Sequence, residues 1–242
     1  MYGWRARIGH ILPAAPLDDA IYEFNQMLPE GVIMSYTSLH IQYLRQEDFD
    51  RALNMLEEAA RIMVEGEVDC IVCGGGPVVT RIGDDNAILD CIRQVTPVPA
   101  ITSASAAIQA MKRLDMGRVV VASPYDEERN RLLAEFLGKQ GIEVVAAEGL
   151  GIRRAMDIAK LPFHASYRLA RDAWRQAHKA DGIYMPCTRL PVVGNIDTLE
   201  SDLGCPVVTS AQSMVWWALN TLRIAPEGRF GKLMHTLRNL PE

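Results

Sequence analysis

Short apolar runs alternate with helix-like segments along nearly the whole chain. Runs such as 68–73 and 182–185 have the length of strands, whereas 48–65 carries apolar residues at helical spacing. Strands that each lead into a helix form parallel sheets with helices on both faces. The sequence therefore predicts an α/β fold.

The bounds of the expected elements follow from this alternation. We expect strands over residues 7–12, 32–36, 68–73, 98–102, 118–122, 143–147, 182–185 and 207–209. We expect helices over residues 18–27, 48–65, 86–94, 103–114, 126–140, 166–179, 196–203 and 211–222.

Two stretches of the chain repeat one order of residues. Residues 68–71 lead through a loop and a helix to 99–104 (PAITSA), and residues 180–183 lead in the same way to 206–211 (PVVTSA). A chance match between two ordinary α/β units is the alternative to a true repeat. A true repeat predicts two similar halves related by pseudo-twofold symmetry, with parallel sheets and an active site in the cleft between their strand-end loops.

The repeat also suggests how the chain is divided. We expect an N-terminal α/β half over residues 1–115 and a C-terminal half over 116–225, with room for the last long helix to pack on the first half. Residues 226–242 are rich in proline and charge, and we expect this tail to pack loosely.

Composition narrows the class of protein. The net charge of -5 gives no electrostatic support for binding nucleic acid or an anionic membrane. No apolar run is long enough to span a bilayer, and the N-terminus has no signal-peptide core, so a cytoplasmic protein is expected. The five cysteines, an odd number, do not suggest a disulfide framework, and no metal-ligand spacing predicts a metal.

Cys70 and Cys73 have the spacing of a redox pair but stand within an apolar run. Side chains alternate faces along a strand, so residues three apart point to opposite sides. We therefore expect both thiols to be buried as small hydrophobic groups.

Several segments together resemble the aspartate/glutamate racemase superfamily, and more narrowly its maleate isomerase and arylmalonate decarboxylase branch. They are 8–15 (IGHILPAA), 123–125 (SPY) with Glu128 and Asn130 behind it, 187–190 (CTRL), Ile196, Leu199, Glu200, Leu203, Gly204, 206–210 (PVVTS) and Trp217. The resemblance implies an active site between two α/β halves and no cofactor. It also implies that racemases and isomerases use one cysteine from each half, whereas the decarboxylase keeps only the second.

The resemblance and the position of the loops select the candidate site residues. Cys187 and Tyr125 are the expected catalytic residues, joined by Cys73 if two cysteines act. Residues expected to bind a small carboxylate substrate, through backbone amides, a hydroxyl or the first loop, are Gly75, Gly76, Thr188, Pro13 and Ala14.

A residue count separates the two cysteine patterns. Cys187 lies six residues after Asp181, and the sixth residue after Asp69 is Gly75. Cys73 lies two residues short of that position, about 6.6 Å deeper along an extended strand. The count favours a single catalytic thiol. The alternative is that the glycine-rich loop has slipped, which would let Cys73 reach the cleft.

The main hypothesis is a cofactor-independent decarboxylase of a malonate-like diacid, aryl- or alkyl-substituted, in which Cys187 protonates an enediolate. The alternative is a maleate cis–trans isomerase or an Asp/Glu-type racemase that uses Cys73 and Cys187. A remote alternative is a two-lobed small-molecule binding protein. The sequence is compatible with a homo-oligomer.

Three features depart from the resemblance or lie beside it. Gly76 and Pro77 stand where the decarboxylase and its relatives place hydroxyl residues, and Pro16 stands where the isomerases have an asparagine. Arg153 and Arg154 could hold a second carboxylate, although solvated surface charge is the favoured interpretation.

Overall fold

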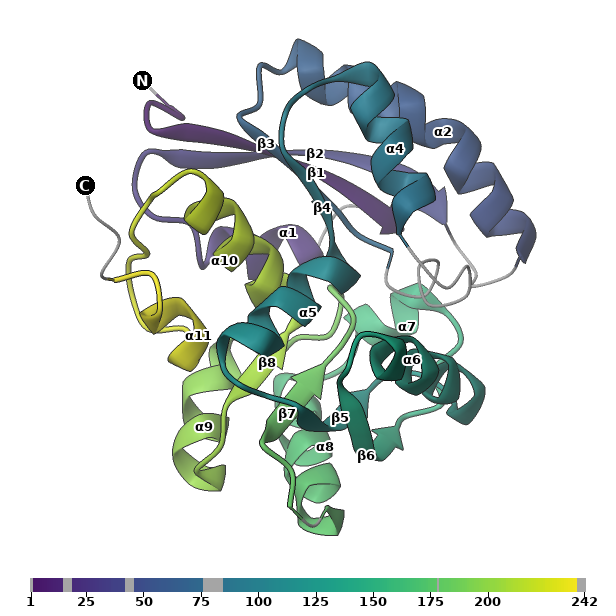
Figure 1. The fold of residues 1–242 in the computed structure, drawn as a ribbon, viewed down its shortest axis with the longest axis vertical. Helices are drawn as coiled ribbons and strands as arrows, with labels where there is room; N and C mark the ends of the chain where they lie inside the picture. Colours follow the sequence, from purple (N-terminus) through teal and green to yellow (C-terminus); the bar gives the residue numbers. More distant parts are fainter. Residues whose placement is uncertain (1, 15–18, 42–45, 76–84, 178, 239–242) are drawn as a thin grey trace.

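The architecture comes from a computed structural model that describes residues 2–14, 19–41, 46–75, 85–177 and 179–238. Eight strands in this part of the chain form two parallel four-stranded sheets, with the orders β2-β1-β3-β4 and β6-β5-β7-β8 (Figure 1). The first sheet contains β1 (Ala6–Ala14), β2 (Val32–Ile41), β3 (Cys70–Cys73) and β4 (Ala100–Thr102). The second contains β5 (Arg118–Ser123), β6 (Glu143–Gly149), β7 (Gly182–Met185) and β8 (Val207–Thr209).

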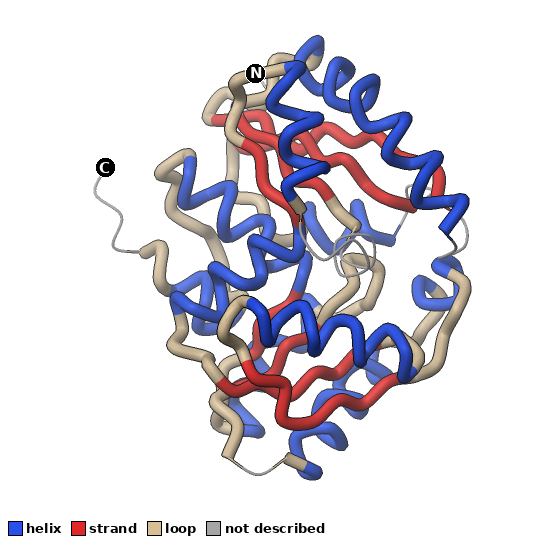
Figure 2. The backbone as a smooth tube through the Cα atoms, turned by 45° about the vertical axis from the view of Figure 1, so that its right-hand side comes forward, coloured by secondary structure: helices blue, strands red, loops and turns tan. Residues whose placement is uncertain are grey.

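Helices surround both sheets, so the predicted α/β class is confirmed (Figure 2). Those of the first half are α1 (Asp19–Asn25), α2 (Gln46–Glu65), α4 (Asn86–Val95) and α5 (Ser103–Arg113). Those of the second are α6 (Glu127–Lys139), α7 (Ala155–Ala159), α8 (Phe163–Gln176), the 3-10 turn η1 (Val193–Asn195), α9 (Ile196–Leu203), α10 (Ser210–Thr221) and α11 (Gly231–His235).

The two halves share a large hydrophobic core, and the second half has a smaller one of its own. Alternate residues of the second sheet face opposite sides, as strand geometry requires. Ile183 and Met185 pack with residues of α8, whereas Tyr184 belongs to a larger core that includes the first sheet, α5 and α10. In Figure 1 the helices α1, α5 and α10 lie between the two sheets. α10 contacts both α5 and β3, so the last long helix packs on the first half.

Matching hydrogen bonds confirm the internal repeat. The backbone amide of Arg7 donates to Asp69 Oδ2 at 2.8 Å, and that of Arg118 donates to Asp181 Oδ2 at 2.7 Å. Each aspartate directly precedes a strand, β3 or β7, and its bond ties the start of that strand to the first strand of the same half, β1 or β5. The strand orders of the two sheets are also equivalent, because each places its four strands in the order second, first, third and fourth along the chain.

The helices that follow the last strand of each half begin in the same way. Thr102 accepts a hydrogen bond from the amide of Ser105, and Thr209 accepts one from the amide of Gln212, so each threonine is an N-cap. The repeated Thr-Ser pair in the sequence therefore marks the point where a strand becomes a helix. The symmetry extends from the sheets to these junctions.

The expectation of a loosely packed tail is wrong for residues 226–238. Leu233, Met234 and Leu237 are buried against the core. Glu200 accepts a hydrogen bond from the amide of Lys232 at 2.7 Å, which fixes the start of the short helix α11. Proline and charge suggested a loose segment, but the buried side chains and this tertiary bond hold it in place.

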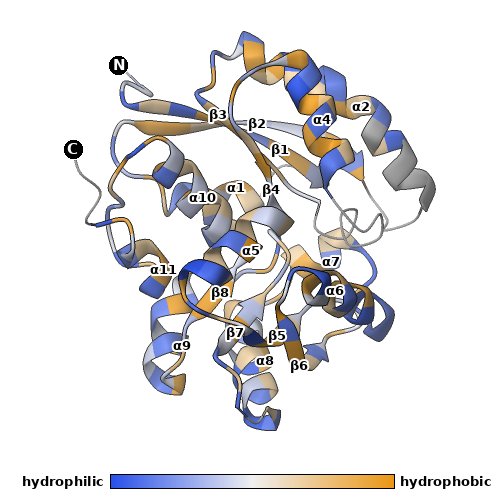
Figure 3. Ribbon diagram, in the orientation of Figure 1, coloured by the Kyte–Doolittle hydropathy of each residue, from blue (hydrophilic) through white to orange (hydrophobic). Residues whose placement is uncertain are grey.

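The hydropathy of the elements matches their place in the fold, with hydrophobic strands inside and a hydrophilic helix outside. β4 and β8 are coloured as hydrophobic in Figure 3, and α6 on the outside is largely hydrophilic. Within the described residues, no helix combines the length and the apolar character that crossing a membrane would need.

Candidate active site

The two inner strands end in equivalent loops. β3 ends at Cys73 and is followed by Gly74 and Gly75, whereas β7 ends at Met185 and is followed by Pro186 and Cys187. Gly75 has φ +119° and Cys187 has φ +88°. The structure therefore confirms the count from the two aspartates, since Gly75 and Cys187 occupy the same place in their halves.

The backbone at Cys187 is unusual for a residue with a side chain. Positive φ values are rare outside glycine, and such strain is concentrated at functional sites. The conformation turns the chain sharply at the end of β7 and leaves the Cys187 side chain only partly buried. This loop presents a thiol at the carboxyl edge of the second sheet, where ligands of parallel sheets bind.

Tyr125 lies against this thiol. Tyr125 is buried just before α6, and its side chain is hydrogen-bonded with that of Cys187. Burial is the main cause that raises the pKa of Tyr125 well above its ordinary value, followed by the charge of Cys187. The phenol therefore stays protonated at neutral pH and can donate to sulfur or to an anion beside it.

A buried polar pair fixes the loop that carries Tyr125. The Ser123 hydroxyl donates to Asn130 Oδ1 at 2.6 Å and accepts from the amide of Tyr125 at 3.1 Å. A side chain at Gly149 would collide with the Tyr125 carbonyl and with Asn130. The close packing around Gly149 holds Tyr125 in one position.

A second tyrosine near the thiol was not predicted from the sequence. The hydroxyl groups of Tyr184 and Ser210 are hydrogen-bonded at 3.3 Å. Burial, more than the nearby charge of Cys187, raises the pKa of Tyr184 to about 12, against the opposing effect of the Ser210 bond. The alternation of faces along β7 was the available signal, because it turns Tyr184 toward the other half.

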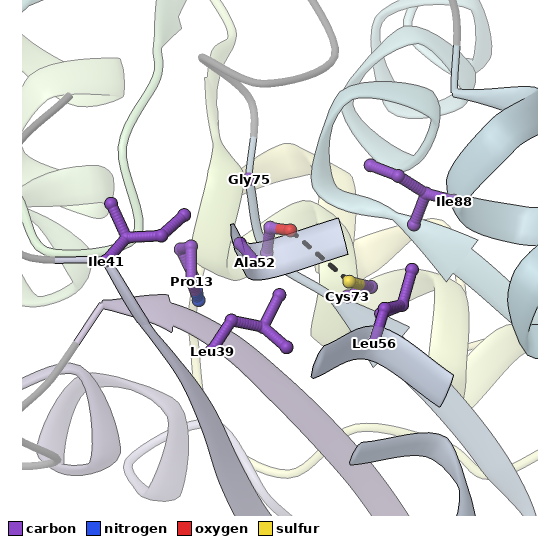
Figure 4. Close-up of a pocket in the computed structure, with 9 residues that line it drawn as sticks. Pro13, Leu39, Ile41, Ala52, Leu56, Cys73, Gly75 and Ile88 are labelled. Carbon is purple, nitrogen blue, oxygen red and sulfur yellow. Dashed lines mark hydrogen bonds between the residues drawn. The ribbon is translucent and has the colours of Figure 1, made fainter. Parts of the chain in front are cut away.

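Cys73 has a different environment from Cys187. Its side chain is 1% exposed, and its thiol donates to the Gly74 carbonyl at 3.4 Å. Figure 4 shows the sulfur beside Leu56, below the loop that carries Gly75. The residues around this small pocket are apolar side chains and two glycines: Pro13, Leu39, Ile41, Ala52, Leu56, Cys73, Gly74, Gly75 and Ile88.

The pocket suppresses ionisation of Cys73. Burial raises the pKa of its thiol to about 12, with smaller effects from Cys91 and Asp85. A thiolate is the reactive form of cysteine in base and nucleophile chemistry. The Cys73 thiol is therefore protonated at neutral pH. Cys70 is also fully buried, which confirms that both cysteines of this run are in the core.

Comparison with known protein families identifies the family of the chain. The model of the arylmalonate decarboxylase family matches residues 8–233. The chain belongs to the arylmalonate decarboxylase family. The branch predicted from the sequence is thereby confirmed.

Individual relatives support the assignment to the arylmalonate decarboxylase family. The arylmalonate decarboxylase of Bordetella bronchiseptica is 26% identical over 218 residues, which is 88% of either chain. A liganded arylmalonate decarboxylase, with one glycine changed to cysteine and one cysteine to serine, has a TM-score of 0.87 at 23% identity, over 94% of this chain and 98% of the other. The maleate isomerase of Pseudomonas putida S16 has a TM-score of 0.84 at 20% identity, over 96% of this chain and 99% of the isomerase chain.

Within this family fold, the predicted substrate-binding residues fall in several places. Pro13 and Gly75 line the same pocket. Thr188 is buried directly after Cys187. Ala14 is the last residue of β1, and its side chain is not described. Gly76 lies outside the described residues, as do Pro77 and Pro16, the two positions that depart from the resemblance.

Arg153 and Arg154 are surface residues. Arg153 Nε lies 3.7 Å from Asp126 Oδ2, and Arg154 Nη1 lies 3.6 Å from Asp157 Oδ1. Both side chains are largely exposed, as the favoured interpretation of the sequence expected. Their charges are thus already partnered on the protein surface.

Replacement of Cys73 by alanine is expected to cost stability but to spare the reaction. The variant loses a buried sulfur in the core, which should lower the free energy of unfolding by about 1 kcal/mol. Denaturant unfolding and turnover of the same preparations measure both effects. Loss of activity as complete as that of a Cys187→Ala variant would contradict the assignment and would make Cys73 an active-site thiol.

Proposed function

We propose that this chain is a cofactor-independent decarboxylase of a malonate-like diacid, with Cys187 as the proton donor. The observation that carries the proposal is the asymmetry of the two equivalent loops. One presents a thiol at Cys187, and the other has Gly75 at the same place. Removal and delivery of a proton on opposite faces of a carbon need two groups, whereas decarboxylation needs one proton donor.

The proposed reaction has two steps. The bond between the α-carbon and one carboxyl carbon breaks, CO2 leaves, and the electron pair stays behind as an enediolate with the remaining carboxylate. The Cys187 S–H proton then moves to the α-carbon. The resulting thiolate takes up one proton from solvent, so each turnover consumes one proton and releases one CO2.

Charge on the enediolate must be met by donors that are already in place. The Tyr125 hydroxyl, protonated and hydrogen-bonded with Cys187, is the best-positioned of these. Thr188 offers its amide and hydroxyl directly after the thiol. The amide of Gly75 offers a third donor, at a position where the lack of a side chain allows close approach. Tyr125 also stabilises the thiolate that remains after proton transfer.

The pocket beside Gly75 is suited to an uncharged group, either a substituent of the substrate or the CO2 that leaves. Its lining of aliphatic side chains, with the neutral thiol of Cys73, favours an uncharged occupant. An aryl or alkyl substituent meets this condition. So does a departing carboxyl group, which loses its charge when it becomes CO2. Both are compatible with a substituted malonate.

The second candidate is an isomerase or racemase that uses Cys73 with Cys187. The similarity in fold to maleate isomerase keeps this candidate open. Its requirement for a second reactive thiol is poorly met by Cys73, which lies in an apolar pocket. A binding protein without chemistry is disfavoured by the partly exposed thiol at a strained backbone position, next to a buried phenol.

A panel of substrates distinguishes these candidates. The purified chain is incubated with aryl- and alkyl-malonates, maleate and single enantiomers of aspartate and glutamate. Release of CO2 from a malonate alone supports the decarboxylase. Formation of fumarate from maleate, or loss of optical activity in an amino acid, would instead establish the second candidate.

Activity is expected to survive removal of metals and small cofactors. None of the described residues form a group of three or more histidine, cysteine or acidic side chains placed to hold a metal ion. The proposed step uses only protein donors and solvent. Turnover is measured before and after exhaustive dialysis against a chelator. Loss of activity that is restored by added metal or coenzyme would contradict cofactor independence.

The expected partner is a small carboxylate. The net charge of -5 gives no support for a nucleic-acid or anionic-membrane partner. A cytoplasmic location and assembly into a homo-oligomer stay predictions, to be tested by fractionation and by the mass in solution.

A further inference from the structure

A buried carboxylate joins the first half of the chain to the loop that follows Cys187. Glu23, on α1, accepts hydrogen bonds from the backbone amides of Val192 at 3.0 Å and Val193 at 2.8 Å. Both bonds end on the same oxygen, Oε2, and Glu23 is 5% exposed. The residues involved are about 170 positions apart in the sequence, so this contact exists only when the two halves are assembled.

The second half holds the other side of the same loop. Ser166 on α8 donates to the Pro191 carbonyl at 2.5 Å, and Asn195 Nδ2 donates to Ser166 Oγ at 3.0 Å. The loop between Cys187 and η1 is thus held by α8 of its own half and by α1 of the first half. Its amide groups at 192 and 193 are satisfied across the boundary between the halves.

Cys187 depends on such support. Its φ of +88° is unfavourable for a residue with a side chain, and it persists only where the surrounding structure determines the backbone. The Cys187 carbonyl accepts a hydrogen bond from the amide of Leu190 at 3.2 Å, which links the strained residue to the start of the tethered loop. The contacts that fix the loop therefore also constrain the backbone of Cys187, through the short turn from Cys187 to Leu190.

We propose that Glu23 is a positioning residue for Cys187, which keeps the thiol in contact with Tyr125 by holding the 188–193 loop against α1. The expected effect of Glu23 on turnover rests on the proposed function. Its expected effect on the position of the thiol does not. The hydrogen bonds of Glu23 are to the amides of Val192 and Val193. Glu23 acts through the loop.

A purely stabilising role explains the carboxylate less well. Burial raises the pKa of Glu23, against the opposing effect of the two amide bonds, so the charged form is held in an unfavourable place. Buried charges of this kind are weak sources of stability. Because one oxygen accepts both bonds, a neutral glutamine could keep the same geometry with its amide oxygen. This property provides a conservative variant for the test.

The chain offers a matched control in Glu200. This residue is also buried, its pKa is also raised by burial, and it accepts bonds from the amides of Val207 at 2.9 Å and Lys232 at 2.7 Å. It joins segments within the second half that do not include the Cys187 loop. Glu200→Ala therefore removes an equivalent buried carboxylate and leaves the proposed connection intact.

The first measurement is the pH profile of alkylation of Cys187 by iodoacetamide, followed by peptide mass spectrometry. Tyr125 and Tyr184 are titratable groups that face the thiol. Loss of the Tyr125 hydrogen bond removes a donor to the thiolate and should move the profile to higher pH. Glu23→Ala should therefore move it in the same direction as Tyr125→Phe, whereas Glu23→Gln and Glu200→Ala should keep the native profile.

The second measurement is turnover of a malonate that the native chain decarboxylates. Displacement of an acid by about 1 Å can cost about 100-fold in rate. We expect Glu23→Ala to lower kcat by about 10- to 100-fold with a much smaller change in KM, and Glu23→Gln to recover most of the loss. Glu200→Ala should stay near the native kcat.

Two results would overturn the inference. A folded Glu23→Ala variant with the native alkylation profile would overturn it, as would an equal effect in Glu200→Ala. If Glu23→Ala does not fold, Glu23→Asp takes its place, since the shorter side chain withdraws the carboxylate from both amides. If no malonate is decarboxylated, the proposed function fails, but the alkylation profiles still decide whether Glu23 positions the thiol.

Discussion

A Cys187→Ser variant is expected to lose about 100- to 10,000-fold in turnover, the range typical of removing a general acid. The serine hydroxyl keeps nearly the same shape but is a far weaker acid than a thiol, so it delivers a proton to the enediolate poorly. The fold should be unaffected, because the side chain is only partly buried. Turnover and thermal unfolding of the variant measure the two quantities.

The matched control is Cys91→Ser. Cys91 is the other cysteine of intermediate exposure, and it lies on α4 in the first half. This variant should retain native turnover. Near-native rates in the Cys187 variant, or an equal loss in both variants, would mean that Cys187 is not the proton donor.

A Gly75→Cys variant is expected to gain a reaction that the native chain lacks. Gly75 and Cys187 occupy equivalent places, so the new thiol should face the opposite side of the substrate carbon. A site with a thiol on both faces can remove a proton on one side and return it on the other. The α-proton of the monocarboxylic product should then exchange with solvent deuterium, and a single enantiomer should become racemic.

The substitution carries a cost in stability. A side chain at the φ of +119° found for Gly75 is strained, by about 1–3 kcal/mol. Cys187 shows that this fold tolerates a cysteine at a positive φ in the other half. Gly75→Ala is the control, since it introduces the same strain without a thiol. Exchange in the alanine variant, or none in a folded cysteine variant, would contradict the assigned position.

The sequence predicted much of the fold because its signals were local. Strand β7, helix α9 and strand β8 have the predicted bounds, and the Asp69 and Asp181 repeat identified equivalent loops. α8 begins at Phe163, three residues earlier than predicted, because Pro162 is its N-cap. The helix α11 was missed, since its five residues are held by tertiary contacts rather than by a helical pattern.

The site was predictable to a smaller extent. The position of Cys187 followed from the count, and the expectation that Tyr125 belongs with it came from the resemblance; the structure brings the two side chains together. Tyr184 and Glu23 were not found, because their relevance depends on contacts between elements. The Glu23 bond to Val192 spans 169 positions, and no local spacing could indicate it.

The central claim is that one thiol delivers one proton after loss of CO2. It is tested most directly by decarboxylating a prochiral disubstituted malonate in deuterated water, and by measuring deuterium content and enantiomeric composition of the product. The account predicts CO2 release, one deuterium at the α-carbon and one enantiomer in excess, with no further exchange in the isolated product. A racemic product that continues to exchange its α-proton would contradict the account and would require a second acid–base group in the site.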